Sequence, residues 1–295
     1  MFHAPVVDIY VTGACNLACR YCFGELDSKP GMKRSVFIQA LDFAEYVRAA
    51  AIEFCGGEPL LYKDILWAVD VVRQRGFRLI LRTNGFYLAR YRSLVASCFD
   101  SVGISLDGDA GTNDIMRPVK GVSALAPEAK FQIPLSEISA LKTINPVIKV
   151  ILASVATRVN IDGLKALARI LVDQHISLDL WKVYQFLDNN FRAKQNSSEF
   201  SLSPTQFNEL TQELAIEVNG AFPLICRKSS EIDGSCLVVN RDGDVLVGSR
   251  CLGNVSEHGP IGLCAKLEES GAEAAILENK QLTYTEVVNN ESVGA

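Results

Sequence analysis

The sequence predicts an α/β fold: a partial (β/α)6 barrel followed by a C-terminal α+β extension. Two observations carry this prediction. Short β-branched runs alternate with segments of helical period up to Phe186, a rhythm typical of a parallel sheet with helices outside it. Six such units can be counted, too few for a closed eight-unit barrel. We therefore expect residues 1–187 to form the barrel and residues 188–295 an extension that closes it.

The predicted elements follow in order along the chain. Apolar, β-branched runs predict strands at Val6–Val11, Ile52–Cys55, Phe77–Leu81, Val102–Leu106, Val147–Val155 and Leu178–Phe186. Apolar residues spaced three and four apart predict helices at Ser35–Ala51, Ile65–Arg75, Ala89–Ser97, Leu135–Thr143 and Ile161–Gln174. Beyond them we expect a polar loop over Asp188–Ser203, a helix over Pro204–Val218, a hairpin turning at Asp242-Gly243 and an irregular final 30 residues.

Composition narrows the function classes. The chain has 295 residues and a net charge of −5, which does not suggest a nucleic-acid-coating surface. We find neither a signal peptide nor an apolar run long enough to cross a membrane, and we expect a reducing, cytoplasmic location. In such a compartment the nine cysteines are read as metal ligands or catalytic groups before disulfides.

Three of these cysteines form the sharpest motif. Cys15, Cys19 and Cys22 are spaced C-x3-C-x2-C, directly after the first predicted strand. Structural zinc prefers four ligands, usually in two C-x2-C pairs. Three thiolates instead suit a [4Fe–4S] cluster with one iron open to a substrate. The carboxyl ends of parallel strands meet at one rim, so Gly56-Gly57-Glu58-Pro59, Thr83-Asn84-Gly85 and Ser105 should converge on this loop.

The segment "CNLACRYC" followed by Phe23, with "GGEP" about 30 residues on, resembles the radical S-adenosylmethionine (SAM) superfamily. This resemblance implies a [4Fe–4S] cluster on Cys15, Cys19 and Cys22. It also implies SAM on the open iron and reductive cleavage of SAM to a 5′-deoxyadenosyl radical.

The other residues that we assign to cofactor binding fit this implied chemistry. Gly56 and Gly57 allow close approach of the backbone to a ligand, because neither has a Cβ. Glu58 suits the methionyl ammonium, and Asn84 and Ser105 suit methionine or ribose oxygens. Arg117 suits the methionyl carboxylate or the ribose. These assignments are Phe23, Gly56, Gly57, Glu58, Asn84, Ser105 and Arg117.

A second likeness extends further along the chain. The segments "SVATRVN", "LDLWKVYQFL" and "CLVVNRDGDVLVGSRC" resemble the viperin-like nucleotide dehydratases. This resemblance implies a lyase with an antiviral role that acts on CTP, UTP or GTP. The radical would remove the ribose C4′ hydrogen, and loss of the 3′-hydroxyl as water would give a 3′-deoxy-3′,4′-didehydro nucleotide. An electron donor such as a flavodoxin or ferredoxin is implied too.

Lysines within predicted strands point to an anionic substrate. Lys182 interrupts an apolar run and should face into the barrel, where an unpaired ammonium is costly. We therefore assign Lys182 a catalytic and substrate-binding role, with Lys149 and Lys29 as further substrate-binding cations.

Two other functions stay open: a radical SAM peptide or small-molecule maturase, and a zinc- or cluster-binding protein without turnover. Cys226, Cys236, Cys251 and Cys264 lack C-x2-C spacing, so we favour buried thiols over an auxiliary cluster. Cys55 and Cys98 are expected in the core.

Overall fold

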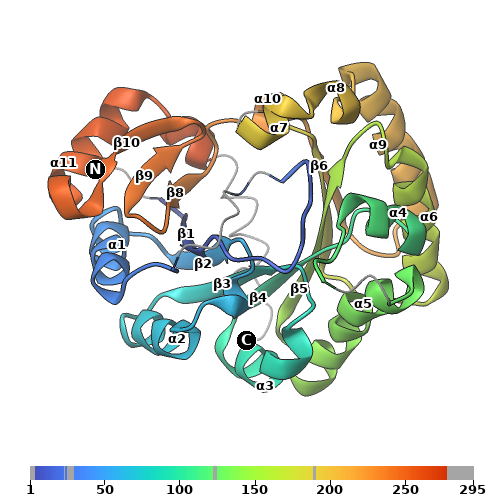
Figure 1. Ribbon diagram of the computed structural model, residues 1–295, viewed down its shortest axis with the longest axis horizontal. Helices are drawn as coiled ribbons and strands as arrows, with labels where there is room; N and C mark the ends of the chain where they lie inside the picture. The colour runs from blue at the N-terminus through green and yellow to red at the C-terminus, as the bar shows by residue number, and fades with distance from the viewer. Residues whose placement is uncertain (1–3, 23, 25–29, 122–124, 189–190, 278–295) are drawn as a thin grey trace, which may run out of the picture.

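The computed structural model describes residues 4–22, 24, 30–121, 125–188 and 191–277. Its strands form one curved sheet in the order β10-β9-β8-β1-β2-β3-β4-β5-β6-β7, with helices along the outside (Figure 1). The two ends of this order, β10 and β7, are the free edges, so the barrel is partial. The predicted fold class is confirmed.

The six predicted strands are all present and pair in parallel with their sequence neighbours. Their bounds are β1 Val6–Thr12, β2 Ala51–Gly56, β3 Arg78–Thr83, β4 Ser101–Ser105, β5 Lys149–Ala156 and β6 Leu180–Gln185. Parallel pairing places every carboxyl end on the same side of the sheet, where the loops after the strands can share one site.

The helices between the strands follow the prediction in outline, but the first ends at Tyr46 instead of Ala51 and two short helices were not predicted. They are α1 Arg34–Tyr46, the short helix η1 Pro59–Leu61, α2 Ile65–Gln74, α3 Leu88–Cys98, α4 Ala110–Met116, α5 Pro127–Ile144 and α6 Ile161–Asp173. Helix α5 begins well before the expected Leu135, because Pro127 occupies its first turn and Pro134 is tolerated inside it. Helix α4 was not predicted; Asp109 caps its start by accepting from the backbone of Thr112.

The C-terminal part extends both edges of the sheet. Strand β7 (Leu224–Arg227) pairs with β6, and β8 (Leu237–Val239) pairs with β1 and forms the predicted hairpin with β9 (Asp244–Val247). The remaining elements are α7 Phe191–Gln195, α8 Ser197–Phe200, α9 Pro204–Val218, α10 Ser229–Ile232, β10 Arg250–Asn254 and α11 Val255–Ser270. Two short helices thus replace the expected loop over 188–203, and α11 reaches into the stretch expected to be irregular. The boundary at residue 187 stays a prediction.

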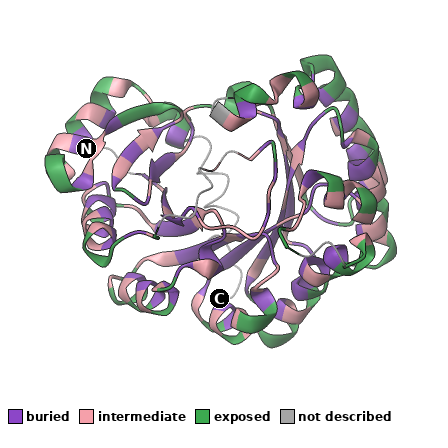
Figure 2. Cartoon of the chain, in the orientation of Figure 1, coloured by how far each residue is buried: buried purple, intermediate pink, exposed green. Residues whose placement is uncertain are grey.

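Burial follows the layers. Apolar side chains fill the space between the sheet and the helices, whose outward faces are exposed (Figure 2). Val6, Ala51 and Ile80 form a separate small apolar cluster on neighbouring strands. Among the helices that the structure describes, none is long and apolar enough to cross a membrane.

Candidate active site

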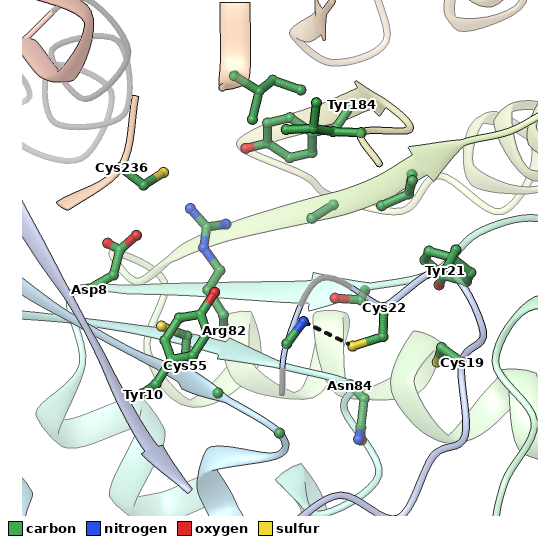
Figure 3. Close-up of a pocket in the computed structure, with 18 of the residues that line it drawn as sticks. Asp8, Tyr10, Cys19, Tyr21, Cys22, Cys55, Arg82, Asn84, Tyr184 and Cys236 are labelled. Carbon is green, nitrogen blue, oxygen red and sulfur yellow. Dashed lines mark hydrogen bonds between the residues drawn. The ribbon is translucent and has the colours of Figure 1, made fainter. Parts of the chain in front are cut away.

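A cavity of about 390 Å³ opens at the carboxyl ends of the strands (Figure 3). It is lined by residues from β1 to β6 and from the C-terminal extension, where Gly234, Cys236 and Gly248 contribute. Eight predicted site residues share this lining: Cys15, Cys19, Cys22, Gly56, Gly57, Asn84, Ser105 and Arg117. The expected convergence of the strand ends is therefore what the structure shows.

The cysteine loop, residues 13–22, leaves β1 and is fastened to the segment after α4. Leu17 forms an isolated bridge with Val119, and the Ala18 amide donates to the Pro118 carbonyl at 2.9 Å. Backbone amides also reach two sulfurs: Leu17 N donates to Cys15 Sγ at 3.4 Å, and Gly24 N donates to Cys22 Sγ at 3.3 Å. Hydrogen bonds of this kind are a recognised way to tune cluster-bound thiolates.

Cys15, Cys19 and Cys22 line one cavity and could hold one group between them. Burial raises the pKa of the Cys19 thiol to about 12, so its thiolate depends on a nearby positive charge. No three His, Cys, Asp or Glu side chains among the described residues, this triad included, converge to hold one metal ion. In a [4Fe–4S] cluster each cysteine meets a different iron, so the sulfurs surround the group instead of converging on a point.

The backbone at Gly56 and Gly57 lies very close to the backbone of another segment of the chain. A Cβ on Gly56 would lie 2.5 Å from the Thr12 carbonyl oxygen, and one on Gly57 would lie 2.3 Å from that of Ala14. The Gly57 and Glu58 amides donate to the same two carbonyls, at 2.7 and 2.8 Å. The glycine pair therefore holds the start of the cysteine loop against the end of β2, and its predicted contact with SAM stays a prediction.

Glu58 is fully buried beside the cavity. Its Oε1 accepts from Thr83 Oγ1 at 2.8 Å and from the Leu60 amide at 3.2 Å, and its Oε2 accepts from the Asn84 amide at 2.8 Å. Burial raises the pKa of Glu58 to about 7, although these hydrogen bonds lower it. The carboxylate thus organises the ends of β2 and β3, and its predicted role toward the methionyl ammonium stays untested.

Arg117 is committed to an ion pair in the cavity wall. Its Nη1 lies 2.8 Å from Asp107 Oδ2 and donates to Tyr21 Oη at 3.0 Å, while the Tyr21 hydroxyl donates to the same carboxylate. Asp107 is fully buried and also accepts from the Val155 amide at 2.6 Å. This triad of Tyr21, Asp107 and Arg117 locks the cysteine loop to the ends of β4 and β5.

Asn84 and Ser105 complete the predicted rim. The Asn84 side-chain Nδ2 donates to Asn16 Oδ1 at 2.8 Å, and its side-chain Oδ1 accepts from the Phe86 backbone amide at 3.0 Å. Asn84 therefore anchors the cysteine loop from the β3 side. Ser105, the last residue of β4, is half-buried in the cavity wall.

Four charged side chains, which we call the barrel floor, lie on the inner face of the strands: Asp8, Glu53, Arg82 and Lys182. Arg82 Nε lies 3.0 Å from Glu53 Oε2, and the Arg82 side chain rises toward the cavity (Figure 3). Gly103 gives it room, because a Cβ there would lie 2.3 Å from Arg82 Nη1. Asp8, Glu53 and Arg82 line the cavity.

The predicted substrate lysines lie in different places. Lys182 is buried on β6 and, two residues before the cavity-lining Tyr184, faces into the barrel. Lys149 begins β5, at the opposite end of the sheet, with its Nζ 3.4 Å from Asp179 Oδ1. Phe23 and Lys29 lie outside the described residues.

Two cysteines expected among the core or buried thiols line the cavity instead. Cys55 ends the inner face of β2, and Cys236 immediately precedes β8. Both are placed there because the inner face of a partial barrel is the cavity wall. Cys226, Cys251 and Cys264 lie on β7, β10 and α11, on three separate elements. Cys264 is buried as expected and Cys226 is half-buried, but Cys251 is exposed, so its predicted burial is wrong.

Sequence reasoning missed Tyr10, Tyr184 and three of the four floor residues. The signal was available: Asp8, Glu53 and Arg82 each interrupt an apolar strand, as Lys182 does. A charged residue in a strand covered on its outer face must face inward. Applied to every strand, that rule would have found the whole barrel floor.

Known proteins resemble the chain in sequence. Residues 9–124 match the model of the Radical SAM superfamily. An S-adenosylmethionine-dependent nucleotide dehydratase of Selenomonas ruminantium is 25% identical over 248 residues, which span 81% of this chain and 85% of that protein. A protein of the same name from a Thermoplasmatales archaeon (strain ISO4-H5) is 29% identical over 101 residues, 34% of this chain and 37% of that protein.

Solved structures share the fold. The structure of anSMEcpe with bound AdoMet superposes with a TM-score of 0.69 at 16% identity, covering 96% of this chain and 87% of that one. Streptococcus suis SuiB bound to S-adenosylmethionine gives 0.67 at 13% identity, covering 88% of this chain and 65% of that one. The match over residues 9–124, which include the cysteine loop at the carboxyl rim of the partial barrel, shows that the chain contains a radical SAM domain.

Proposed function

We propose that the chain is a radical SAM nucleotide dehydratase acting on CTP, UTP or GTP, a lyase with an antiviral role. The observation that carries this proposal is the extent of the likeness to the Selenomonas dehydratase, which spans 81% of the chain. The superfamily match ends at residue 124, so the likeness must include sequence outside that segment.

The superfamily implies a [4Fe–4S] cluster and SAM as cofactors. When bound, they supply a 5′-deoxyadenosyl radical, which would take the C4′ hydrogen of the ribose. A second electron from the external one-electron donor and a proton would then let the 3′-hydroxyl leave as water. Cys15, Cys19 and Cys22 would hold the cluster. Leu17, Tyr21, Phe186 and Phe200 pack around the loop in one apolar cluster, which excludes water from that side.

The barrel floor would receive the far end of the substrate. Lys182 supplies an inward cation beneath Tyr184, and we assign it the catalytic and polyphosphate-binding role. Lys29 remains a predicted contributor, whereas Lys149 lies at the amino end of β5 beside Asp179, and we assign it no contact with the nucleotide. Holding the nucleotide against this fixed layer would keep its ribose near the cysteine loop, which is how positioning lowers a barrier.

The floor also favours a second candidate function. Asp8 and Glu53 offset the charges of Arg82 and Lys182, so the four formal charges sum to zero. A neutral layer is less suited to a polyphosphate than a basic one. This observation keeps a radical SAM small-molecule or peptide maturase as the alternative.

One experiment separates the two. The protein is reconstituted anaerobically with iron and sulfide, then incubated with SAM, dithionite and each ribonucleoside triphosphate. We expect 5′-deoxyadenosine together with a nucleotide lighter by one water, identified by mass spectrometry. Production of 5′-deoxyadenosine that no nucleotide stimulates, with every nucleotide recovered unchanged, would point to the maturase.

A further inference from the structure

The charges of the barrel floor are separated within the cavity. Asp8 and Glu53 are register partners on the neighbouring strands β1 and β2, and both line the cavity. Arg82 follows on β3, with its Nε 3.0 Å from Glu53 Oε2. These three residues, two carboxylates and one guanidinium, have a net formal charge of −1, and we call them the acidic wall. Lys182 lies on β6, and four strands separate β6 from β1 in the sheet. The acidic wall and this cation therefore occupy different sides of the cavity.

Arg82 keeps hydrogen-bonding capacity beyond its ion pair with Glu53. Its Nη1 is buried against Gly103 and has no hydrogen-bond partner among the residues that the structure describes. Burial lowers the pKa of Arg82, but the nearby Glu53 and Asp8 carboxylates hold it above its usual value. The Arg82 guanidinium and the Asp8 carboxylate both extend into the cavity (Figure 3). An unsatisfied buried donor costs free energy, and a ligand that supplies an acceptor removes this cost. The acidic wall thus offers acceptors and donors side by side.

This separation of charge orients a nucleotide in the cavity. Two neighbouring carboxylates repel a polyphosphate and Lys182 attracts it, whereas a neutral nucleobase with N–H and C=O groups suits the acidic wall. Uracil has a single ring N–H, and the two N–H groups of cytosine are on one nitrogen. Guanine presents N1–H and N2–H next to each other, where one carboxylate accepts both, and places its O6 beside them for a guanidinium. Among these three bases, guanine therefore has the best match to an arginine beside carboxylates.

We propose that the acidic wall selects guanine, so that GTP is the nucleotide that this cavity binds. Asp8 accepts from guanine N1–H and N2–H, because Glu53 is already paired with Arg82. Arg82 donates to guanine O6, and Lys182 meets the polyphosphate on the other side of the cavity. The inference rests on the proposed nucleotide dehydratase and adds the base that this function leaves open.

The wild-type protein gives the first test. GTP, inosine triphosphate, CTP and UTP are each titrated by calorimetry into the cluster-loaded protein with SAM bound. Inosine triphosphate differs from GTP only in lacking the N2 amino group. We expect GTP to bind about tenfold or more tightly than each of the other three, because each lacks a hydrogen bond to a charged group of the acidic wall.

A change of specificity gives the second test. In Asp8→Asn the new amide donates to the C2 carbonyl of xanthine and its oxygen accepts from N1–H, whereas it cannot accept both N–H groups of guanine. We expect this variant to bind GTP about tenfold or more weakly and xanthosine triphosphate about tenfold or more tightly than the wild type does. Asp70→Asn, at an exposed position on α2, is the matched control and should change both affinities less than twofold. A gain in affinity for xanthosine triphosphate cannot come from misfolding.

The outcomes separate this inference from the proposed function. Equal affinity of the wild type for GTP and inosine triphosphate overturns guanine selection, as does tighter binding of CTP or UTP. Conversion of CTP or UTP in preference to GTP overturns it too, and leaves nucleotide dehydration standing. Selective binding of GTP that is then recovered unchanged overturns dehydration and leaves guanine selection standing. Binding of none of the four nucleotides would overturn both.

Discussion

The cysteine loop and the barrel floor face each other across one cavity, yet they are built differently. The loop is a short local segment held by contacts from several strand ends: Asn84 from β3, Asp107 from β4 and the glycine pair from β2. The floor is a set of single charged residues, each on its own strand, brought together only by the register of the sheet. The loop motif can be recognised in one short stretch of sequence, whereas the floor residues must be recognised in four separate strands.

This difference has a physical consequence. Loop residues hold a group that arrives from outside, so their loss should remove chemistry and spare the fold. Within the floor, Glu53 and Arg82 form a buried ion pair, so the loss of either should affect stability as well as binding.

The largest effect is expected at the loop. Replacing Cys15, Cys19 or Cys22 with Ala removes one of three cluster ligands, so bound iron and sulfide should fall and SAM cleavage should vanish. Iron analysis and chromatography of 5′-deoxyadenosine measure both. Cys251→Ala, at an exposed cysteine of β10, is the control and should retain both. A triple Ala variant that still makes 5′-deoxyadenosine would remove the loop from the chemistry.

Next comes the floor ion pair. Arg82→Met leaves Glu53 buried without its partner at 3.0 Å and should lower the free energy of unfolding by about 3–5 kcal/mol. Anaerobic urea unfolding measures this change. Arg82→Met/Glu53→Leu removes both charges and should regain most of the loss. If Arg82→Met alone is as stable as wild type, the floor is not an interdependent layer.

Lys182 and Lys149 form a matched pair for substrate binding. Lys182→Ala should weaken nucleotide binding by about tenfold or more, because removing a buried cation costs at least about 1.4 kcal/mol. Lys149→Ala should change it less than twofold, since this lysine pairs with Asp179 at the amino end of β5. Calorimetry with SAM bound measures both. An equal loss of nucleotide affinity in the two variants would support the sequence-based prediction that Lys149 binds substrate.

The smallest effect is a pH dependence at Glu58. Its pKa rises from 4.5 to about 7 on folding. Between pH 4.5 and about 7, the folded state therefore keeps a proton on Glu58 that the unfolded state has lost. The stability that Glu58 contributes should therefore fall as pH rises from about 4.5 to about 7, by up to about 3 kcal/mol. Thermal unfolding of wild type and Glu58→Gln at several pH values isolates this contribution. If Glu58 accepts the methionyl ammonium, saturating SAM should flatten the dependence; an unchanged slope would limit Glu58 to its structural hydrogen bonds.

The sequence predicted the barrel well because its signals are local. Each of the six strands carries an apolar run, and most intervening helices carry a clear period. The C-terminal part was harder. Strand β7 has only four residues, all half-buried, and α7 and α8 are too short and polar to show a period. The pairing of β8 with β1 is a long-range contact, which no local sequence pattern predicts.

The candidate site divides in the same way. The cysteine motif, the glycine pair and Asn84 were found because each follows a strand directly. The partners of Arg117 were not found: the sequence suggested a ligand for this cation, whereas the structure supplies Asp107 and Tyr21. Pairing between side chains on different loops depends on how those loops fold over the rim, which periodicity cannot give.

Asp8 pairs with Val238, so strand β1 cannot complete its pairing during synthesis until β8 has left the ribosome. Strand β1 gains its first neighbour once β2 has emerged, but its other edge stays uncovered until nearly the whole barrel has been synthesised. A strand with an open edge can pair with other chains, and long-range pairing is slow. The cysteine loop grows out of this strand, so iron delivered before β8 arrives would meet a loop rooted in an unfinished sheet.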